Sequence, residues 1–153
     1  MIFIHGGGFA YQAAPHHFSL ARRFAKKLNC KVFMVDYRLA PKYKFPQAPN
    51  DSFTCYRWIL DHAGQLKIDK STIAICGDSA GGNLATVVSI MARDKEIQLP
   101  CAQVLLYPVT DRRMHTESMK QYADTPMCNT KDMEKRVCYL RKKWEETEGN
   151  VLE

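Results

Sequence analysis

The chain has 153 residues, of which 46% are hydrophobic and 25% are charged, a composition that excludes a disordered or fibrous protein and fits one globular domain. No apolar run reaches the roughly 18 residues of a membrane-spanning helix, so we expect no membrane span. The formal net charge is +6, but its basic clusters fall on expected helices with apolar opposite faces, so we expect no nucleic-acid partner.

A short strand opens the chain, and a helix follows it. Residues 1–4 are apolar, a glycine-rich loop comes next, and apolar side chains then recur at helical spacing over residues 18–28. Residues 31–37 are rich in β-branched and aromatic side chains and predict a second strand. The proline-punctuated stretch 41–49 predicts a loop.

Helices and strands continue to alternate after this loop. Asn50 or Asp51 can cap the next helix, which has a regular apolar face. Residues 72–76 predict a third strand, residues 82–93 a helix and residues 102–107 a fourth strand. This alternation predicts an α/β fold with a mostly parallel sheet that helices cover on both faces.

The segment after the fourth strand carries weaker signals. Met133, Val137, Leu140 and Trp144 recur at helical spacing and predict one amphipathic helix. This helix could pack on the sheet, contribute to a cap over a site, or present Trp144 to another chain, and the pattern does not choose among them.

The strongest chemical motif is Gly77-x-Ser79-x-Gly81, between the third strand and the next helix. In such a turn the serine backbone is strained and its hydroxyl is lifted clear, while the glycines let strand and helix approach each other. The start of the helix adds N–H donors for a developing negative charge. We therefore predict that Ser79 is a nucleophile; a glycine turn with an incidental serine is the alternative.

A second motif, His5-Gly6-Gly7-Gly8, follows the first strand. A serine alkoxide that attacks an ester carbonyl creates an oxyanion, which preorganised backbone N–H groups can stabilise. Glycines let the backbone approach, and lipases and esterases place their oxyanion loop at this point of the fold. A phosphate-binding loop is the alternative, but neither G-x-x-x-x-G-K-[ST] nor G-x-G-x-x-G matches.

Four sequence blocks together resemble the hormone-sensitive-lipase family of α/β-hydrolases. They occur in the family's order and reach as far as Asp111, with a looser likeness in 124–126 and 130–133. The four blocks are His5-Gly6-Gly7-Gly8-Phe9, Asp36-Tyr37-Arg38-Leu39-Ala40-Pro41, Gly77-Asp78-Ser79-Ala80-Gly81-Gly82-Asn83 and Tyr107-Pro108-Val109-Thr110-Asp111.

The resemblance implies a role for each matching residue. It implies that Ser79 attacks the substrate and that the backbone N–H groups of three residues form the oxyanion hole, namely Gly7, Gly8 and Ala80. It also implies that His5 shapes the loop without acting as the base, and that Asp78 stiffens the serine turn. Gly6, Gly77 and Gly81 support these two motifs.

The acid and the histidine of a serine triad follow the serine in this fold, and we find neither of the segments that carry them in family members. His115 is the one histidine after Ser79, and it comes too soon after the fourth strand to match the family's histidine loop. It is retained as a candidate base. We expect surface or capping roles for His16, His17 and His62.

Family members are longer than this chain, so we interpret it as a partial α/β-hydrolase domain that is incomplete at both ends. The domain spans 1–153, with a core at 1–111 and a helical, cap-like segment at 112–153. Its cut sheet would expose edge strands, through which a homo-oligomer or strand exchange could form.

These features predict a carboxylic ester hydrolase that acts on small or short-acyl esters through an acyl-enzyme, with the triad acid and histidine missing from this chain. Two alternatives stay open. One is a catalytically silent hydrolase-fold protein that binds a small ligand, a class that the family contains. The other is an oligomerising fragment without a biochemical role of its own.

No cofactor and no metal are expected. The six cysteines show neither a C-x-x-C pair nor a Cys/His cluster at metal-ligand spacing, and they predict reduced thiols. No targeting signal precedes the first strand, so we expect a cytoplasmic location.

Overall fold

Four parallel strands form one sheet in the order β2-β1-β3-β4. The computed structural model describes residues 1–111, 116–126 and 129–140. The sheet confirms the predicted parallel α/β fold. Its strands are β1 (Ile2–Ile4), β2 (Phe33–Val35), β3 (Ala74–Asp78) and β4 (Ala102–Leu106).

The interior strands of the sheet are buried on both faces. Phe3 of β1 pairs with Met34 of β2 and Cys76 of β3, and Cys76 pairs with Val104 of β4. All three residues of β1 are buried, whereas the first four residues of the edge strand β4 are exposed. This burial explains why β1 is apolar at every position rather than at alternate ones.

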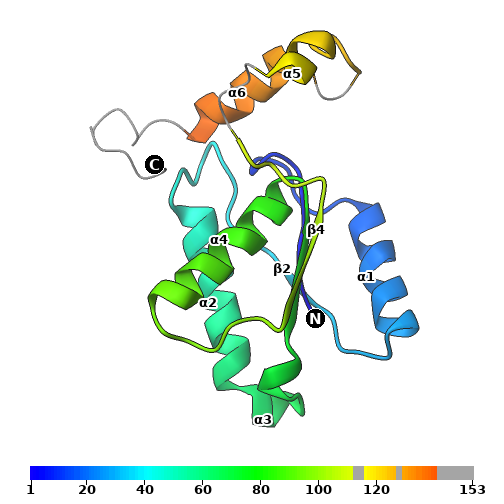
Figure 1. Cartoon of the computed structure of the whole chain (residues 1–153), viewed down its shortest axis with the longest axis vertical. Coiled ribbons are helices and arrows are strands. Elements are labelled where there is room, and N and C mark those ends of the chain that lie inside the picture. Colours follow the sequence, from blue (N-terminus) through cyan, green and yellow to red (C-terminus); the bar gives the residue numbers. More distant parts are fainter. Residues whose placement is uncertain (112–115, 127–128, 141–153) are drawn as a thin grey trace.

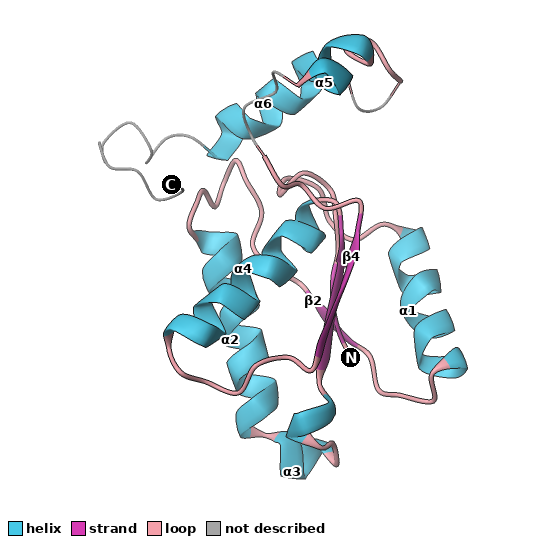
Figure 2. Cartoon of the chain, viewed as in Figure 1, coloured by secondary structure: helices cyan, strands magenta, loops and turns pink. Residues whose placement is uncertain are grey.

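Helices cover both faces of the sheet, as Figure 2 shows. Helix α1 (Pro15–Lys27) lies on one face, where Phe3, Ala21 and Cys76 form a small buried cluster. Helices α2 (Gln47–Asp61) and α4 (Ala80–Asp94) lie on the other face, over the larger cluster that includes Ile4, Tyr56 and Leu84. The short α3 (Ala63–Leu66) and the 3-10 helix η1 (Lys70–Thr72) follow α2.

Helix α2 begins earlier than its sequence suggests. The predicted loop over 41–49 is confirmed for 41–46 and wrong for 47–49, because the helix already starts at Gln47. The predicted cap at Asn50 or Asp51 is wrong for the same reason. Pro49 is the third residue of the helix, where a backbone N–H has no carbonyl partner within the helix and its loss costs little. The side chain of Asp51 instead accepts hydrogen bonds from Arg38 Nε at 2.9 Å and Nη2 at 2.7 Å.

The C-terminal helices lie across the carboxyl ends of the strands, as Figure 1 shows. They are α5 (Glu117–Gln121) and α6 (Thr130–Leu140). The predicted amphipathic helix is therefore present up to Leu140, and Trp144 lies outside the described residues. Of the helices that the structure describes, none is long and apolar enough to span a membrane.

We predict that Leu84→Ala destabilises the fold much more than Ile90→Ala. Both residues belong to α4, but Leu84 is fully buried and Ile90 is 42% exposed. Truncation at Leu84 leaves a cavity and should lower the free energy of unfolding by about 2–5 kcal/mol. Truncation at Ile90 should lower it by less than about 1 kcal/mol. Urea unfolding followed by circular dichroism measures both changes, and equal losses would contradict the packing of α4 on the sheet.

Candidate active site

Ser79 lies in a tight turn between β3 and α4. Its φ of 50° and ψ of −118° are strained for a residue with a side chain. Its N–H donates to the Leu106 carbonyl at 2.9 Å, and its own carbonyl accepts from the Val109 N–H at 3.1 Å. The strained strand-to-helix turn that the sequence predicts is therefore present, and the chain at the end of β4 holds it in place.

Glycines allow the close approach of β3 to α4 that this turn requires. A Cβ built on Gly77 would lie 2.2 Å from the Gly81 carbonyl oxygen, and one on Gly81 would lie 2.0 Å from the Ile4 carbonyl oxygen. A Cβ on Gly82 would lie 2.9 Å from Pro108 Cβ. No larger residue fits at Gly77 or Gly81 without a shift of the backbone.

The loop after β1 brings backbone N–H groups to the same edge of the sheet. Gly7 and Gly8 have φ values of 119° and 59°, which favour glycine. Within the described chain, the N–H groups of these two glycines donate to no other backbone group. Ala80 is the first residue of α4, so its N–H has no acceptor within the helix. Among the described residues, no backbone carbonyl accepts a hydrogen bond from these N–H groups.

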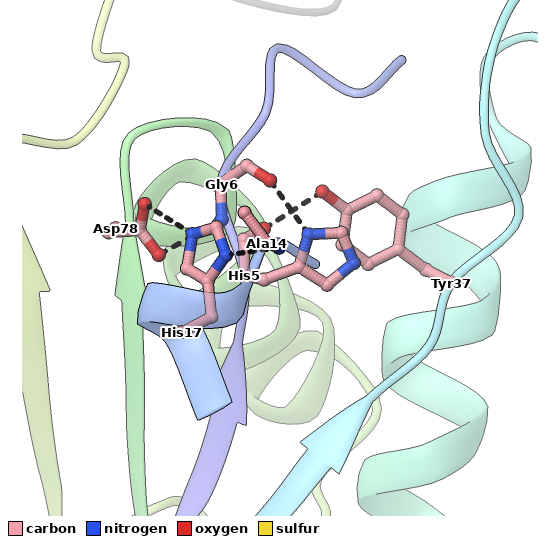
Figure 3. Close-up of polar contacts among 6 residues, drawn as sticks. All are labelled: His5, Gly6, Ala14, His17, Tyr37 and Asp78. Carbon is pink, nitrogen blue, oxygen red and sulfur yellow. Dashed lines mark hydrogen bonds and ion pairs between the residues drawn. The ribbon is translucent and has the colours of Figure 1, made fainter. Parts of the chain in front are cut away.

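A buried carboxylate joins this loop to the serine turn. Asp78 Oδ1 accepts from the Gly6 N–H at 2.9 Å, and Asp78 Oδ2 lies 3.3 Å from His17 Nε2 (Figure 3). The Ala14 N–H donates to His17 Nδ1 at 2.8 Å, so Nδ1 is an acceptor. The Nε2–H group of His17 then donates a hydrogen bond to Asp78 Oδ2. Asp78 and His17 are 5% and 4% exposed.

The expected role of His17 was half right. His17 bonds to the backbone at the start of α1, which is a capping role, but it is buried rather than at the surface. One signal in the sequence could have shown its burial. His17 precedes Ala21 by one helical turn and therefore shares the buried face of α1.

His5 forms part of the wall of the loop. Its Nδ1 donates to the Gly6 carbonyl at 2.7 Å, and its ring stacks on Tyr37 with 4.5 Å between ring centroids. Burial lowers the pKa of His5, partly offset by the hydrogen bond to Gly6, so the imidazole is neutral at neutral pH. Burial also raises the pKa of Tyr37, whose hydroxyl stays protonated and donates to the His5 carbonyl at 2.8 Å.

The block around Tyr37 also fixes the far end of the loop. The Ala40 N–H donates to the Phe9 carbonyl at 2.9 Å. Next to Tyr37, Arg38 holds the pKa of Asp51 at about 2 through a paired hydrogen bond. Asp51 therefore stays ionised at neutral pH and anchors this block to α2.

The described residues give no geometric sign of a base beside Ser79. No hydrogen bond joins the Ser79 hydroxyl to another side chain in the described ranges, and the rings of His5, His17 and His62 bind other partners. His115 lies outside the described residues. In the same ranges, no group of three or more His, Cys, Asp or Glu side chains could hold a metal ion.

A serine in a strained turn, at the carboxyl edge of a parallel sheet beside a glycine loop, defines the α/β-hydrolase class. Comparison with known proteins agrees: a family model described as the alpha/beta hydrolase fold matches residues 1–147, and the chain belongs to this family.

Several relatives of the chain are ester hydrolases or lipases by name. It is 34% identical over 135 residues to the ethyl acetate hydrolase of Pseudomonas putida, covering 88% of this chain and 42% of that protein. It is 37% identical over 110 residues to hormone-sensitive lipase of Mus musculus, covering 72% of this chain and 14% of that protein. These matches confirm the resemblance to hormone-sensitive-lipase-like hydrolases.

Among solved structures, a hyperthermophilic esterase from Pyrobaculum calidifontis superimposes with a TM-score of 0.89 at 36% identity. The match covers 95% of this chain and 48% of that one. The chain therefore spans less than half the length of these relatives.

We predict that Gly81→Ala and Gly64→Ala have opposite effects on stability. The new methyl group at Gly81 would meet the backbone of β1, so the free energy of unfolding should fall by at least about 2 kcal/mol. Gly64 lies in α3 with no atom near its Cβ position, so alanine there should raise the free energy of unfolding by up to about 1 kcal/mol. Thermal unfolding distinguishes the two, and a well-tolerated Gly81→Ala would contradict the close approach.

We predict that Asp78→Asn destabilises the chain although it keeps the size of the side chain. An amide has one acceptor oxygen, so its NH2 group must face an N–H of Gly6 or His17. The free energy of unfolding should fall by about 1–3 kcal/mol. The control is Asp94→Asn, at an exposed ion pair, which should change it by less than about 1 kcal/mol. Urea titrations of both variants provide the comparison, and equal effects would mean that the Asp78 bonds contribute no stability.

Proposed function

We propose that this chain carries the nucleophile and the oxyanion hole of a carboxylic ester hydrolase. The observation that carries the proposal is the strained, half-buried Ser79 at the edge of the sheet where the free N–H groups of Gly7, Gly8 and Ala80 also lie. The names of the relatives, an ethyl acetate hydrolase and an esterase among them, support ester chemistry.

In the proposed reaction, Ser79 Oγ attacks the carbonyl carbon of a small or short-acyl ester. The carbonyl oxygen becomes an oxyanion, which accepts hydrogen bonds from Gly7, Gly8 and Ala80. When the intermediate collapses, the carbon–oxygen bond to the alcohol breaks and an acyl group stays on Ser79. Water then attacks this ester, the acid leaves and the serine is restored.

A base must take the proton of Ser79 and return it to the leaving alcohol. No described side chain forms a hydrogen bond with the Ser79 hydroxyl, so we propose that the base and its acid partner come from outside the described residues, with His115 as the candidate within this chain. We further propose that residues 1–111 form the catalytic core and that 112–153 form a cap-like segment. The cap segment would then limit the size of the ester.

The α4 dipole supports the same assignment of roles. The helix has fifteen residues and begins directly after Ser79, so its positive end faces the position of the oxyanion. Loss of one oxyanion donor in enzymes of this kind typically lowers kcat by about 10²–10³-fold.

A second candidate is a protein that binds a small ligand at this site without hydrolysis. The observation that favours it is the lack of a base on Ser79 among the described residues. A homo-oligomer or strand exchange has a separate basis: Val104 and Leu105 of the edge strand β4 are 36% and 37% exposed.

Hydrolysis of 4-nitrophenyl acetate by the full chain and by Ser79→Ala tests the proposal. We expect Ser79→Ala to lower the rate at least about tenfold, because it removes the nucleophile. Added imidazole should raise the rate of the unsubstituted chain beyond its effect on Ser79→Ala, because an external base replaces the missing one. The matched control is Ser89→Ala in α4, whose hydroxyl donates to the Ala85 carbonyl and should not affect the rate.

Two results would decide against ester hydrolysis by this chain. Equal rates for the chain and for Ser79→Ala, with and without imidazole, would overturn the serine mechanism and favour the ligand-binding alternative. A rate that falls equally in Ser79→Ala and Ser89→Ala would reflect damage to α4 rather than loss of a nucleophile.

A further inference from the structure

Arg136 of α6 rests on the loop that we assign to the oxyanion hole. A Cβ built on Gly8 would lie 2.6 Å from Arg136 Cδ and 3.3 Å from both Nε and Nη1. The guanidinium carbon lies 5.5 Å from the centre of the Tyr11 ring. Figure 1 shows α6 across the carboxyl ends of the strands, at the edge that also carries the serine turn. A positive charge from the C-terminal segment thus borders the site.

This guanidinium has no acidic partner among the described residues. Two other arginines, Arg38 and Arg93, form ion pairs with carboxylate oxygens at 2.7 and 2.8 Å. In the described ranges, no carboxylate oxygen lies within 4 Å of the Arg136 guanidinium. Asp132 lies one helical turn before Arg136, but both its side chain and its N–H bond to Asn129. The Asp78 carboxylate is buried and has its own donors.

A half-buried guanidinium with no carboxylate partner among the described residues is suited to bind an anion. Its N–H groups form a planar fork that matches the two oxygens of a carboxylate, and contact with an aromatic ring limits its motion. The absence of a side chain at Gly8 gives the Arg136 stem its place on the loop, because any Cβ there would collide with Cδ.

We infer that Arg136 determines specificity by binding a carboxylate carried by the substrate. The inference rests on the proposed ester hydrolase function, and it narrows the substrate class to esters with a free carboxylate on either the acyl or the alcohol portion. An arginine that served only to pack α6 on the loop would give no preference between a carboxylate and a neutral group of the same shape.

Binding to the full chain with Ser79→Ala tests this inference without any need for turnover. The acyl-side pair of probes is monobenzyl glutarate and its carboxamide, and the alcohol-side pair is 4-(acetoxymethyl)benzoate and its carboxamide. Within each pair the shape is matched and only the charge differs. Ligand-observed NMR gives the Kd of each probe.

We expect the carboxylate of at least one pair to bind about fivefold or more tightly than its amide. The pair that shows the preference identifies the portion of the ester that carries the charge. Adding Arg136→Gln should bring the ratio of the two Kd values close to one, and Arg136→Lys should restore part of it. Lys135→Gln, an exposed charge on the same helix, is the control and should leave the ratio unchanged.

Equal Kd values within both pairs, binding of no carboxylate, or a preference that survives Arg136→Gln would each overturn the inference. The outcome is separate from that of the hydrolysis assay. A preference that depends on Arg136 in a chain without Ser79-dependent turnover would support the carboxylate site and refute catalysis by this chain. Ser79-dependent turnover without the preference would support catalysis and refute the carboxylate site.

Discussion

The buried carboxylate of Asp78 is the constraint on which the candidate site depends. A carboxyl group that is only 5% exposed is costly to bury unless hydrogen-bond donors surround it. The chain supplies one donor from the loop after β1 and one from α1, through Gly6 and His17. Since Asp78 directly precedes Ser79, these two bonds fix the serine turn relative to the glycine loop. Gly6 must also lack a side chain, because a Cβ there would lie 2.3 Å from Asp78 Oδ2.

The four blocks of the family resemblance therefore correspond to one connected structure. The first and third blocks meet at Asp78, and the second joins the first where the Tyr37 hydroxyl donates to the His5 carbonyl. The fourth block joins the third, because the Val109 N–H bonds to Ser79 while Asn83 Nδ2 donates to the Val109 carbonyl at 2.9 Å. Segments up to a hundred residues apart share one edge of the sheet, since parallel strands bring their carboxyl ends together.

Much of this arrangement is visible in the sequence because it depends on local rules. Apolar strands, helical spacing and the glycines around Ser79 each leave a pattern within a few residues. The parts that were missed depend on contacts across the fold. Pro49 looks like a loop residue until α2 is seen to begin before it, and nothing near Arg136 indicates that its side chain reaches Gly8. No described side chain forms a hydrogen bond with the Ser79 hydroxyl, so neither pattern nor geometry assigns a triad base.

Backbone strain separates the site from the rest of the fold. Three residues with positive φ, namely Asn29, Lys67 and Glu96, lie at helix ends. The N–H after each of them bonds to a carbonyl five residues earlier, as in ordinary C-terminal helix caps.

In the part of the chain that the structure describes, the other three residues with positive φ and a side chain are Phe9, Ser79 and Tyr107. All follow strands or the glycine loop at the carboxyl edge, where no helix ends. Such strain persists only when the surrounding structure over-determines the backbone. At Ser79 three hydrogen bonds do this: its N–H donates to the Leu106 carbonyl, and its carbonyl accepts from the N–H groups of Asn83 and Val109. These bonds hold the half-buried Ser79 rigidly in a strained conformation, which is the physical reason to propose chemistry at this edge.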